Sequence, residues 1–99
     1  MNIQVQAVNF NAGAELCDFI AKKYAKLRNY YDKITAIQVY LKVANTPDKR
    51  NKVVETKLSI PREEIVVKKT CRTFEEGTDL SLDILKRRIS RCKEKTKIH

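Results

Sequence analysis

The sequence predicts an α+β domain in which a four-stranded sheet carries two helices on one of its faces. Four segments alternate apolar and polar residues, as half-buried strands do. Two longer segments repeat apolar residues every three or four positions, as amphipathic helices do. The elements follow one another as β-α-β-β-β-α. With 99 residues, of which 42% are hydrophobic, the chain has the size of one domain with one core.

The first strand and the first helix occupy the N-terminal third of the chain. Residues 1–8 alternate between polar and apolar and form the strand. A turn follows, in which we expect Phe10 to reach the core. Residues 12–31 form the helix, because one apolar stripe runs along them. The stripe consists of Leu16, Phe19, Ile20, Tyr24, Leu27 and Tyr31.

Three strands come next, at residues 34–45, 53–60 and 65–73. The first of them alternates most regularly. Lys69 interrupts the alternation of the last, so the register is less well defined at that end. The apolar sides consist of Ile37, Val39, Leu41 and Val43, then Val54, Thr56, Leu58 and Ile60, then Ile65, Val67 and Cys71.

Residues 78–95 form the second helix, with Asp79 and Asp83 at its start, where carboxylates complement the helix dipole. One polar face on every strand predicts a mixed, mostly antiparallel sheet with both helices on the same face. The strand-helix-strand crossover makes the first two strands parallel, as neighbours or near neighbours. The layout is like that of a double-stranded RNA-binding domain. The apolar stripe of the second helix consists of Leu82, Leu85, Ile89 and Cys92.

The formal charge of +9 indicates a polyanionic partner, with nucleic acid first, an anionic membrane surface second and an acidic protein third. Five basic residues fall within residues 22–33, and seven, with one acid, within residues 86–97. We expect one electropositive surface, with the potential concentrated in the groove between the helices. Ordinary solvated surface is the plain alternative, but the arginines favour phosphate contacts. The candidate RNA-binding residues are Lys22, Lys23, Lys26, Arg28, Lys86, Arg87, Arg88, Arg91, Lys93 and Lys95.

The sequence offers no pattern for catalysis, metal binding or a cofactor. Its three cysteines are far apart, its histidine is the last residue and its two glycines make no phosphate-binding loop. We therefore expect no enzyme activity, no metal, no cofactor and reduced, structural cysteines. No apolar run reaches the ~20 residues of a membrane span, and residues 1–7 do not have the form of a signal peptide. These two features predict a cytoplasmic protein.

Five segments together carry a resemblance to a known family: residues 19–27, 30–34, 37–43, 58–67 and 79–89. The last of them is similar to a helix with the pattern D-x-x-x-D-x-L-x-R-Q-hydrophobic, and a Lys-rich tail follows it. The family is that of the ribosome hibernation promoting factors, also called ribosome-associated inhibitors or sigma-54 modulation proteins. The resemblance covers essentially the whole chain.

The resemblance implies a factor that binds the small ribosomal subunit and its 16S rRNA near the decoding centre. It would block the mRNA and tRNA sites and inhibit translation in stationary phase or stress. It also implies the short form of the family: a monomer with one ribosome-binding domain over residues 1–99 and no C-terminal dimerisation domain. Any pairing of ribosomes would then need a separate partner. Lys23, Lys26, Arg87, Arg91, Lys93 and Lys95 match basic positions of the family, whereas Ile84 stands where relatives usually have Lys.

Two other functions remain open. The chain could be a general double-stranded RNA-binding domain, which would bind a plain RNA duplex as well as it binds small subunits. It could instead be a protein-interaction module that modulates a transcription factor, as the older family name suggests. Binding that ignores salt and ribonuclease would indicate that third function.

Overall fold

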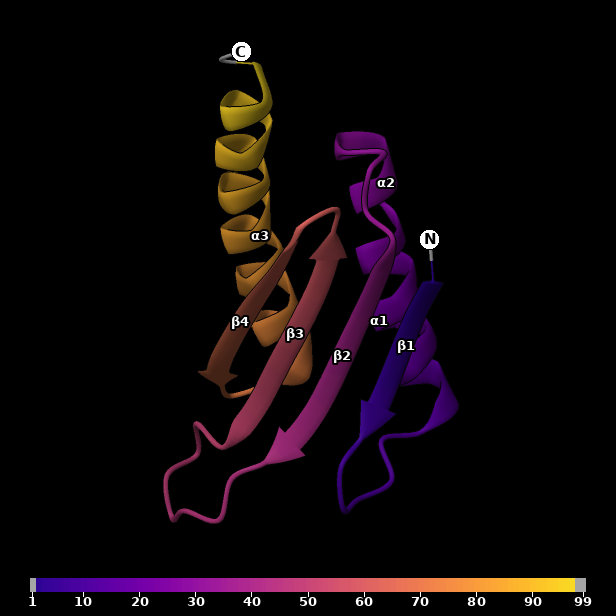
Figure 1. Ribbon diagram of the computed structural model, residues 1–99. Helices are drawn as coiled ribbons and strands as arrows, with labels where there is room; N and C mark the ends of the chain where they lie inside the picture. Colours follow the sequence, from indigo (N-terminus) through magenta and orange to yellow (C-terminus); the bar gives the residue numbers. More distant parts are fainter. Residues whose placement is uncertain (1, 98–99) are drawn as a thin grey trace.

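A single sheet with the strand order β1-β2-β3-β4 packs one face against the helices (Figure 1). The computed structural model describes the backbone of residues 2–97 and the side chains of residues 2–93. β1 pairs with β2 in parallel, and the other pairs are antiparallel. The predicted α+β fold, its element order and its mixed sheet are confirmed. The elements are β1 (Asn2–Ala7), α1 (Ala14–Ala25), α2 (Leu27–Tyr30), β2 (Ala36–Val43), β3 (Lys52–Ile60), β4 (Glu63–Cys71) and α3 (Phe74–Lys97).

The core lies between the sheet and the helices and uses the predicted apolar sides of the strands. Tyr24 of α1 and Thr56 of β3 meet inside it, with 2.6 Å between their hydroxyl oxygens. Burial raises the pKa of the Tyr24 hydroxyl above its ordinary value of 10.0. This contact joins the first helix to the middle of the sheet. The fully buried apolar side chains include Ile20, Ile37, Val39, Leu41, Val54, Leu58, Leu85 and Ile89.

Two residues expected in the core are exposed instead. Phe19 is 40% exposed on α1, and its ring lies 5.4 Å from the Lys23 ammonium. Val43 is 46% exposed because it is the last residue of β2, beyond Leu41, where the pairing with β1 ends. Phe10 does reach the core, where its ring stacks on Phe74 with 5.5 Å between centroids.

The sequence predicted one continuous first helix, but the structure has two. α1 ends at Ala25, and α2 resumes at Leu27 for one turn. Lys26 lies between them with ψ −18°, and its N–H reaches back to the Lys23 carbonyl at 3.4 Å. That contact spans three residues rather than four, which is the tighter 3₁₀ geometry. The break needs neither glycine nor proline, so residue types alone did not reveal it.

The second helix begins at Phe74, four residues before the predicted start. Thr73 caps it, since its hydroxyl accepts the Glu76 N–H at 3.1 Å. The Thr-x-x-Glu spacing of residues 73–76 is a helix-start signal that outweighs the glycine at 77. β4 correspondingly ends at Cys71 rather than at residue 73. Asp79 therefore does not lie in the first turn, which carries Glu75 and Glu76 instead.

Gly77 lets α3 approach the sheet closely. A Cβ atom at this position would lie 2.7 Å from Val54 Cγ2, well inside van der Waals contact. Val54 is fully buried in β3 and β-branched, so its methyl group has no free rotamer to move into. The glycine is therefore a packing requirement inside a helix, where it would otherwise weaken the structure.

Replacing Gly77 tests this contact. Gly77→Ala should lower the free energy of unfolding by about 1 kcal/mol, because overpacking costs more than the helix propensity that Ala contributes. Urea unfolding measures the change. In a Val54→Ala background, which makes room for the new methyl group, the same substitution should be neutral or stabilising. An equal loss in both backgrounds would show that the two residues are not coupled.

The Tyr24 hydroxyl gives a second prediction, with a pH dependence. Tyr24→Phe should lower the free energy of unfolding by about 1–2 kcal/mol at neutral pH, because the buried Thr56 hydroxyl loses its partner. Tyr24 in the unfolded chain ionises near 10.0, and its pKa in the folded chain is higher. Above about pH 10 the free energy of unfolding of wild type therefore falls through ionisation of Tyr24, whereas the variant has no such loss. The difference in free energy of unfolding between the two proteins thus narrows. Urea titrations at neutral pH and up to about pH 11 measure it; a constant difference would contradict the assignment.

Candidate nucleic-acid interface

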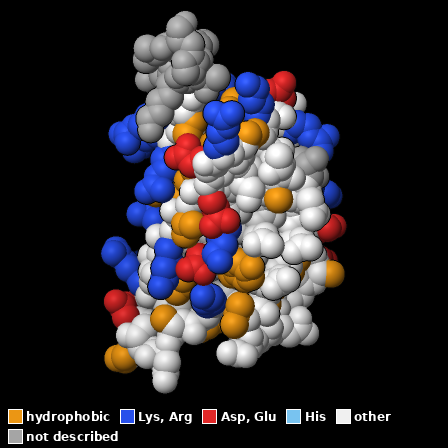
Figure 2. All heavy atoms as spheres, in the orientation of Figure 1, with side chains coloured by type: hydrophobic (Ala, Val, Ile, Leu, Met, Phe, Trp, Pro, Cys, Tyr) orange, Lys and Arg blue, Asp and Glu red, His pale blue; other side chains and the backbone are white. Residues whose placement is uncertain are grey.

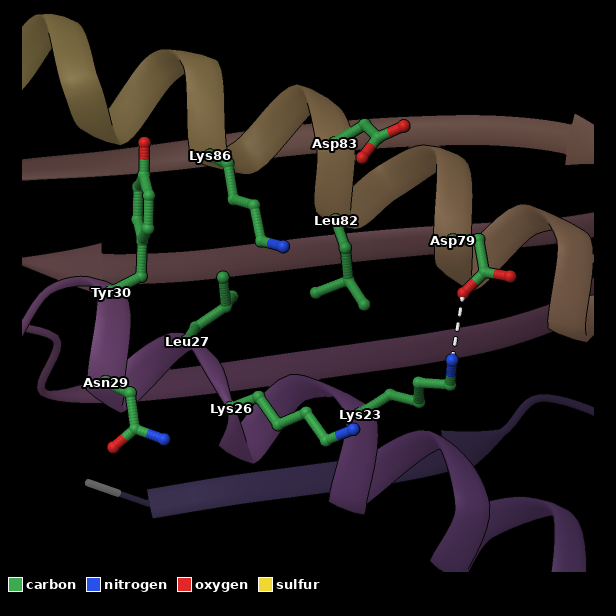
Figure 3. Close-up of a pocket in the computed structure, with 9 residues that line it drawn as sticks. All are labelled: Lys23, Lys26, Leu27, Asn29, Tyr30, Asp79, Leu82, Asp83 and Lys86. Carbon is green, nitrogen blue, oxygen red and sulfur yellow. Dashed lines mark hydrogen bonds and ion pairs between the residues drawn. The ribbon is translucent and has the colours of Figure 1, made fainter.

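A groove of about 500 Å³ separates the first helices from α3 (Figure 3). α1 and α2 form one wall and α3 the other, and Leu27 and Leu82 lie between the two walls. Both walls stand on the same face of the sheet, so their relative position follows from the shared core. The other lining residues are Lys23, Lys26, Asn29, Tyr30, Asp79, Asp83 and Lys86.

An ion pair crosses the groove at one end. The Lys23 ammonium lies 3.4 Å from the Asp79 carboxylate, and the two side chains are 34% and 63% exposed. Lys23 thus extends along the protein and emerges at the groove, as its place at the edge of the apolar stripe predicted. Its partner was not predicted.

The groove is nearly balanced in charge. Three lysines and two aspartates line it, so the net charge of the lining is +1. The two aspartates offset much of the lysine charge, and the concentration of positive potential between the helices stays a prediction. The cause of this offset is the helical periodicity: residues 79, 83 and 86 are spaced by four and three positions and lie on one side of α3. The two acids that were assigned to the helix dipole line the groove instead, and Asp79 pairs with Lys23 of α1.

Other candidate residues lie outside this groove. Lys22, Arg28 and Arg87 are exposed and do not line it. Arg87 lies two residues after the buried Leu85, about 200° around the helix, so it points away from the core. None of these three forms an ion pair with a described side chain.

Arg88 and Arg91 lie on the opposite side of α3, toward β4. They line a depression of about 270 Å³ together with Glu63 and Glu64. The Arg88 guanidinium donates a hydrogen bond to the Val66 carbonyl, with 3.2 Å between the atoms. Candidate residues with described side chains therefore lie on both sides of α3. Ile84, on the same helix, is half-buried against the core.

Lys93 has a structural role. Its ammonium donates to the Tyr30 carbonyl at 2.6 Å and lies 4.5 Å from the centre of the Tyr30 ring and 5.6 Å from that of Tyr31. Tyr30 ends α2, and its hydroxyl is hydrogen-bonded to Ser90. A cation at the C-terminal end of a helix satisfies its last carbonyls. The side chain of Lys95 lies outside the described part of the chain.

The open face of the sheet differs in character from the helix side. Lys42 pairs with Glu55 at 3.3 Å, and the Lys57 ammonium lies 5.8 Å from the centre of the Tyr40 ring. Figure 2 shows Asp and Glu among the basic residues along β3, a mainly uncharged area over β1 and β2, and Lys and Arg gathered toward β4 and α3. This face thus has no continuous basic surface in the region over β1 and β2.

The described residues contain no metal-binding cluster, no helix able to span a membrane and no disulfide. No group of three or more His, Cys, Asp or Glu side chains is arranged to hold a metal ion. None of the helices within residues 2–97 has the length and apolar character to span a bilayer. The three cysteines, all within this range, form no disulfide.

Comparisons with known proteins agree with the fold. The family model described as "Sigma 54 modulation protein / S30EA ribosomal protein" matches residues 3–97. The chain belongs to this family. It is 30% identical over 95 residues to a protein of Pseudomonas putida named ribosome hibernation promoting factor, with 96% of this chain and 89% of that protein covered. The predicted family resemblance is confirmed.

Solved structures share the fold of this family member. A ribosomal subunit interface protein from Coxiella burnetii superimposes with a TM-score of 0.82 at 20% identity, covering 95% of this chain and 99% of that one. The N-terminal domain of Protein Y from Thermus thermophilus superimposes with a TM-score of 0.76 at 23% identity, covering 92% and 98%. The second match compares this chain with one domain of another protein.

Lys93 provides a test of which cations are structural. Lys93→Met keeps the aliphatic stem and removes the ammonium, so it should lower the free energy of unfolding by about 1–2 kcal/mol through the lost hydrogen bond and ring contacts. Arg87→Met, at an exposed position, should change it by less than about 0.5 kcal/mol. Urea unfolding of both variants measures the two changes in free energy of unfolding. Equal changes would contradict the structural role of Lys93.

Proposed function

We propose that this protein is a ribosome hibernation factor that binds the small ribosomal subunit through the exposed basic side chains of the helices that cover its sheet. Membership in the family supports this, together with the name of the Pseudomonas putida relative. The observation that carries the proposal is the exposure of Lys22, Lys26, Arg28 and Arg87, which make no ion pair with a described side chain. Such cations are available to phosphates.

Phosphate contacts supply the affinity in this proposal. Each Lys or Arg that neutralises an rRNA phosphate releases condensed counterions, so binding should weaken steeply with salt. Arginine adds bidentate geometry, which suits phosphate oxygens. Among the described side chains, the helices expose no row of aromatic rings on which bases could stack, so recognition rests on the shape and phosphate spacing of folded rRNA.

Inhibition follows from occupancy. The domain measures 50 × 25 × 18 Å and is held together by one core, so it binds as a solid body. Bound near the decoding centre, with its helices on rRNA, it would fill space that mRNA and tRNA need in stationary phase or under stress. The chain acts in the cytoplasm as a monomer and performs no reaction in this proposal. Pairing of ribosomes would need a separate partner.

A general double-stranded RNA binder is the second candidate, favoured by the basic side chains that lie on both sides of α3. The two functions differ in what competes for the protein. A plain RNA duplex should compete weakly against small subunits if the first proposal holds and equally if the second does. Binding that persists in high salt and after ribonuclease would instead indicate a protein-interaction module.

Charge reversal tests the proposed interface. The triple variant Lys22→Glu, Lys26→Glu and Arg87→Glu should bind small subunits about a hundredfold more weakly at moderate salt, because it replaces three phosphate contacts with repulsion. Co-sedimentation and inhibition of in vitro translation measure the loss, which should appear in both.

The control is a second triple variant that changes the net charge by the same amount at positions outside the helices. Lys49→Glu, Arg50→Glu and Lys68→Glu alter the loop between β2 and β3 and the exposed side of β4. This triple variant should retain most of its binding. Wild-type binding by the helix variant, or equal loss in both variants, would reject the helices as the interface.

A further inference from the structure

We propose that Asp79 and Asp83 are specificity-determining residues that keep a phosphate backbone out of the groove between the helices. Phosphate contacts are then left to basic side chains outside the groove, such as Lys22, Arg28 and Arg87, and to the exposed Lys26 of its lining. The inference rests on the proposed function, in that the helices face RNA. It assigns the two acids a role in selecting the RNA rather than in holding the fold.

The Lys23–Asp79 pair does not serve stability in the usual way. The Asp79 side chain is 63% exposed and that of Lys23 is 34% exposed, so water screens the pair. Ion pairs this exposed contribute little to folding. The core beneath them is already closed by Leu27 and Leu82, which are 1% and 9% exposed. The pair instead engages the ammonium of one of the three lysines that line the groove.

Without the acids, the groove would be a generic anion site. Lys23, Lys26 and Lys86 reach it from both walls, and three ammonium groups around about 500 Å³ would attract any phosphate. Asp79 and Asp83 lower the net charge of the lining to +1. A phosphate entering the groove would have to displace Lys23 from Asp79 and then lie beside an uncompensated carboxylate.

The consequence is discrimination between RNA shapes. Repulsive elements raise specificity by penalising wrong partners more than they reward the right one. A uniform duplex, whose phosphates form continuous ridges, meets the acids wherever a ridge crosses the groove. A folded RNA whose phosphates are spaced to reach only the flanks avoids them. Carboxylates also accept hydrogen bonds from the amino groups of bases, so a base edge is tolerated where a phosphate is not.

Asp79→Asn removes the charge and keeps the shape of the side chain. Salt titrations of binding to a plain RNA duplex and to purified small subunits measure its effect. Duplex affinity should rise about two- to fivefold at low salt, which corresponds to one exposed ion pair. The slope of log K against log salt should steepen by about 0.7–0.9, because the released Lys23 gains a phosphate. Affinity for small subunits should rise less, so the ratio of the small-subunit affinity to the duplex affinity falls. Asp79→Asn with Asp83→Asn should lower it further.

Two further variants separate the causes. Asp48→Asn, an equal change of charge at an exposed position in the loop between β2 and β3, should leave the duplex slope unchanged. Lys23→Met combined with Asp79→Asn should return the slope to the wild-type value. A duplex affinity and slope that are unchanged or lower in Asp79→Asn would overturn the inference.

The outcome is distinguishable from failure of the proposed function. If wild type does not bind small subunits, the proposed function fails, whereas the duplex titrations still report whether the acids exclude phosphates. If wild type binds small subunits and Asp79→Asn leaves the affinity ratio unchanged, the inference alone fails. The variants change exposed side chains, except at the half-buried Lys23, and circular dichroism with urea unfolding verifies that they fold.

Discussion

The close approach of α3 to β3 at Gly77 determines how every other residue of that helix is oriented. A Cβ atom there would collide with Val54, so only glycine allows the helix to lie this near the sheet. With Leu85 and Ile89 also turned inward, the rotation of the helix about its axis is fixed. Successive residues then follow at about 100°. Asp79 and its neighbours on the same side face α1, whereas the arginines near the C-terminal end point outward or toward β4.

The opposite wall of the groove is placed by a polar contact inside the core. Tyr24 is fully buried and meets Thr56 of β3 through its hydroxyl, which ties α1 to the same strand that seats α3. Buried hydroxyl pairs are directional, so they specify one arrangement where apolar packing alone would permit several. Lys93 then joins the far end of α3 to the last turn of α2. The width of the groove is thus a property of the core rather than of the residues that line it.

Alternation and helical periodicity predicted the elements because they are local. The inner sides of β2, β3 and β4 were foreseen almost residue by residue, and the parallel pairing of β1 with β2 follows from the crossover rule. The failures have particular causes. Gly77 suggests a helix break, yet it lies inside α3 because a Thr73 cap precedes it and Val54 leaves no room for a side chain. Lys26 interrupts the first helix through backbone geometry that no residue type announces.

The candidate site shows the same division. Composition and spacing place the cations on two helices and predict a polyanionic partner and the layout of the fold, whereas the family was predicted from the resemblance of five segments. They do not establish which cations are available, because ion pairs and caps join residues far apart in the chain. Lys23 meets Asp79 across 56 positions, and Lys93 meets Tyr30 across 63. Side-chain charge is a property of the residue, whereas the field it produces depends on which opposite charge the packing of the core brings within a few ångströms.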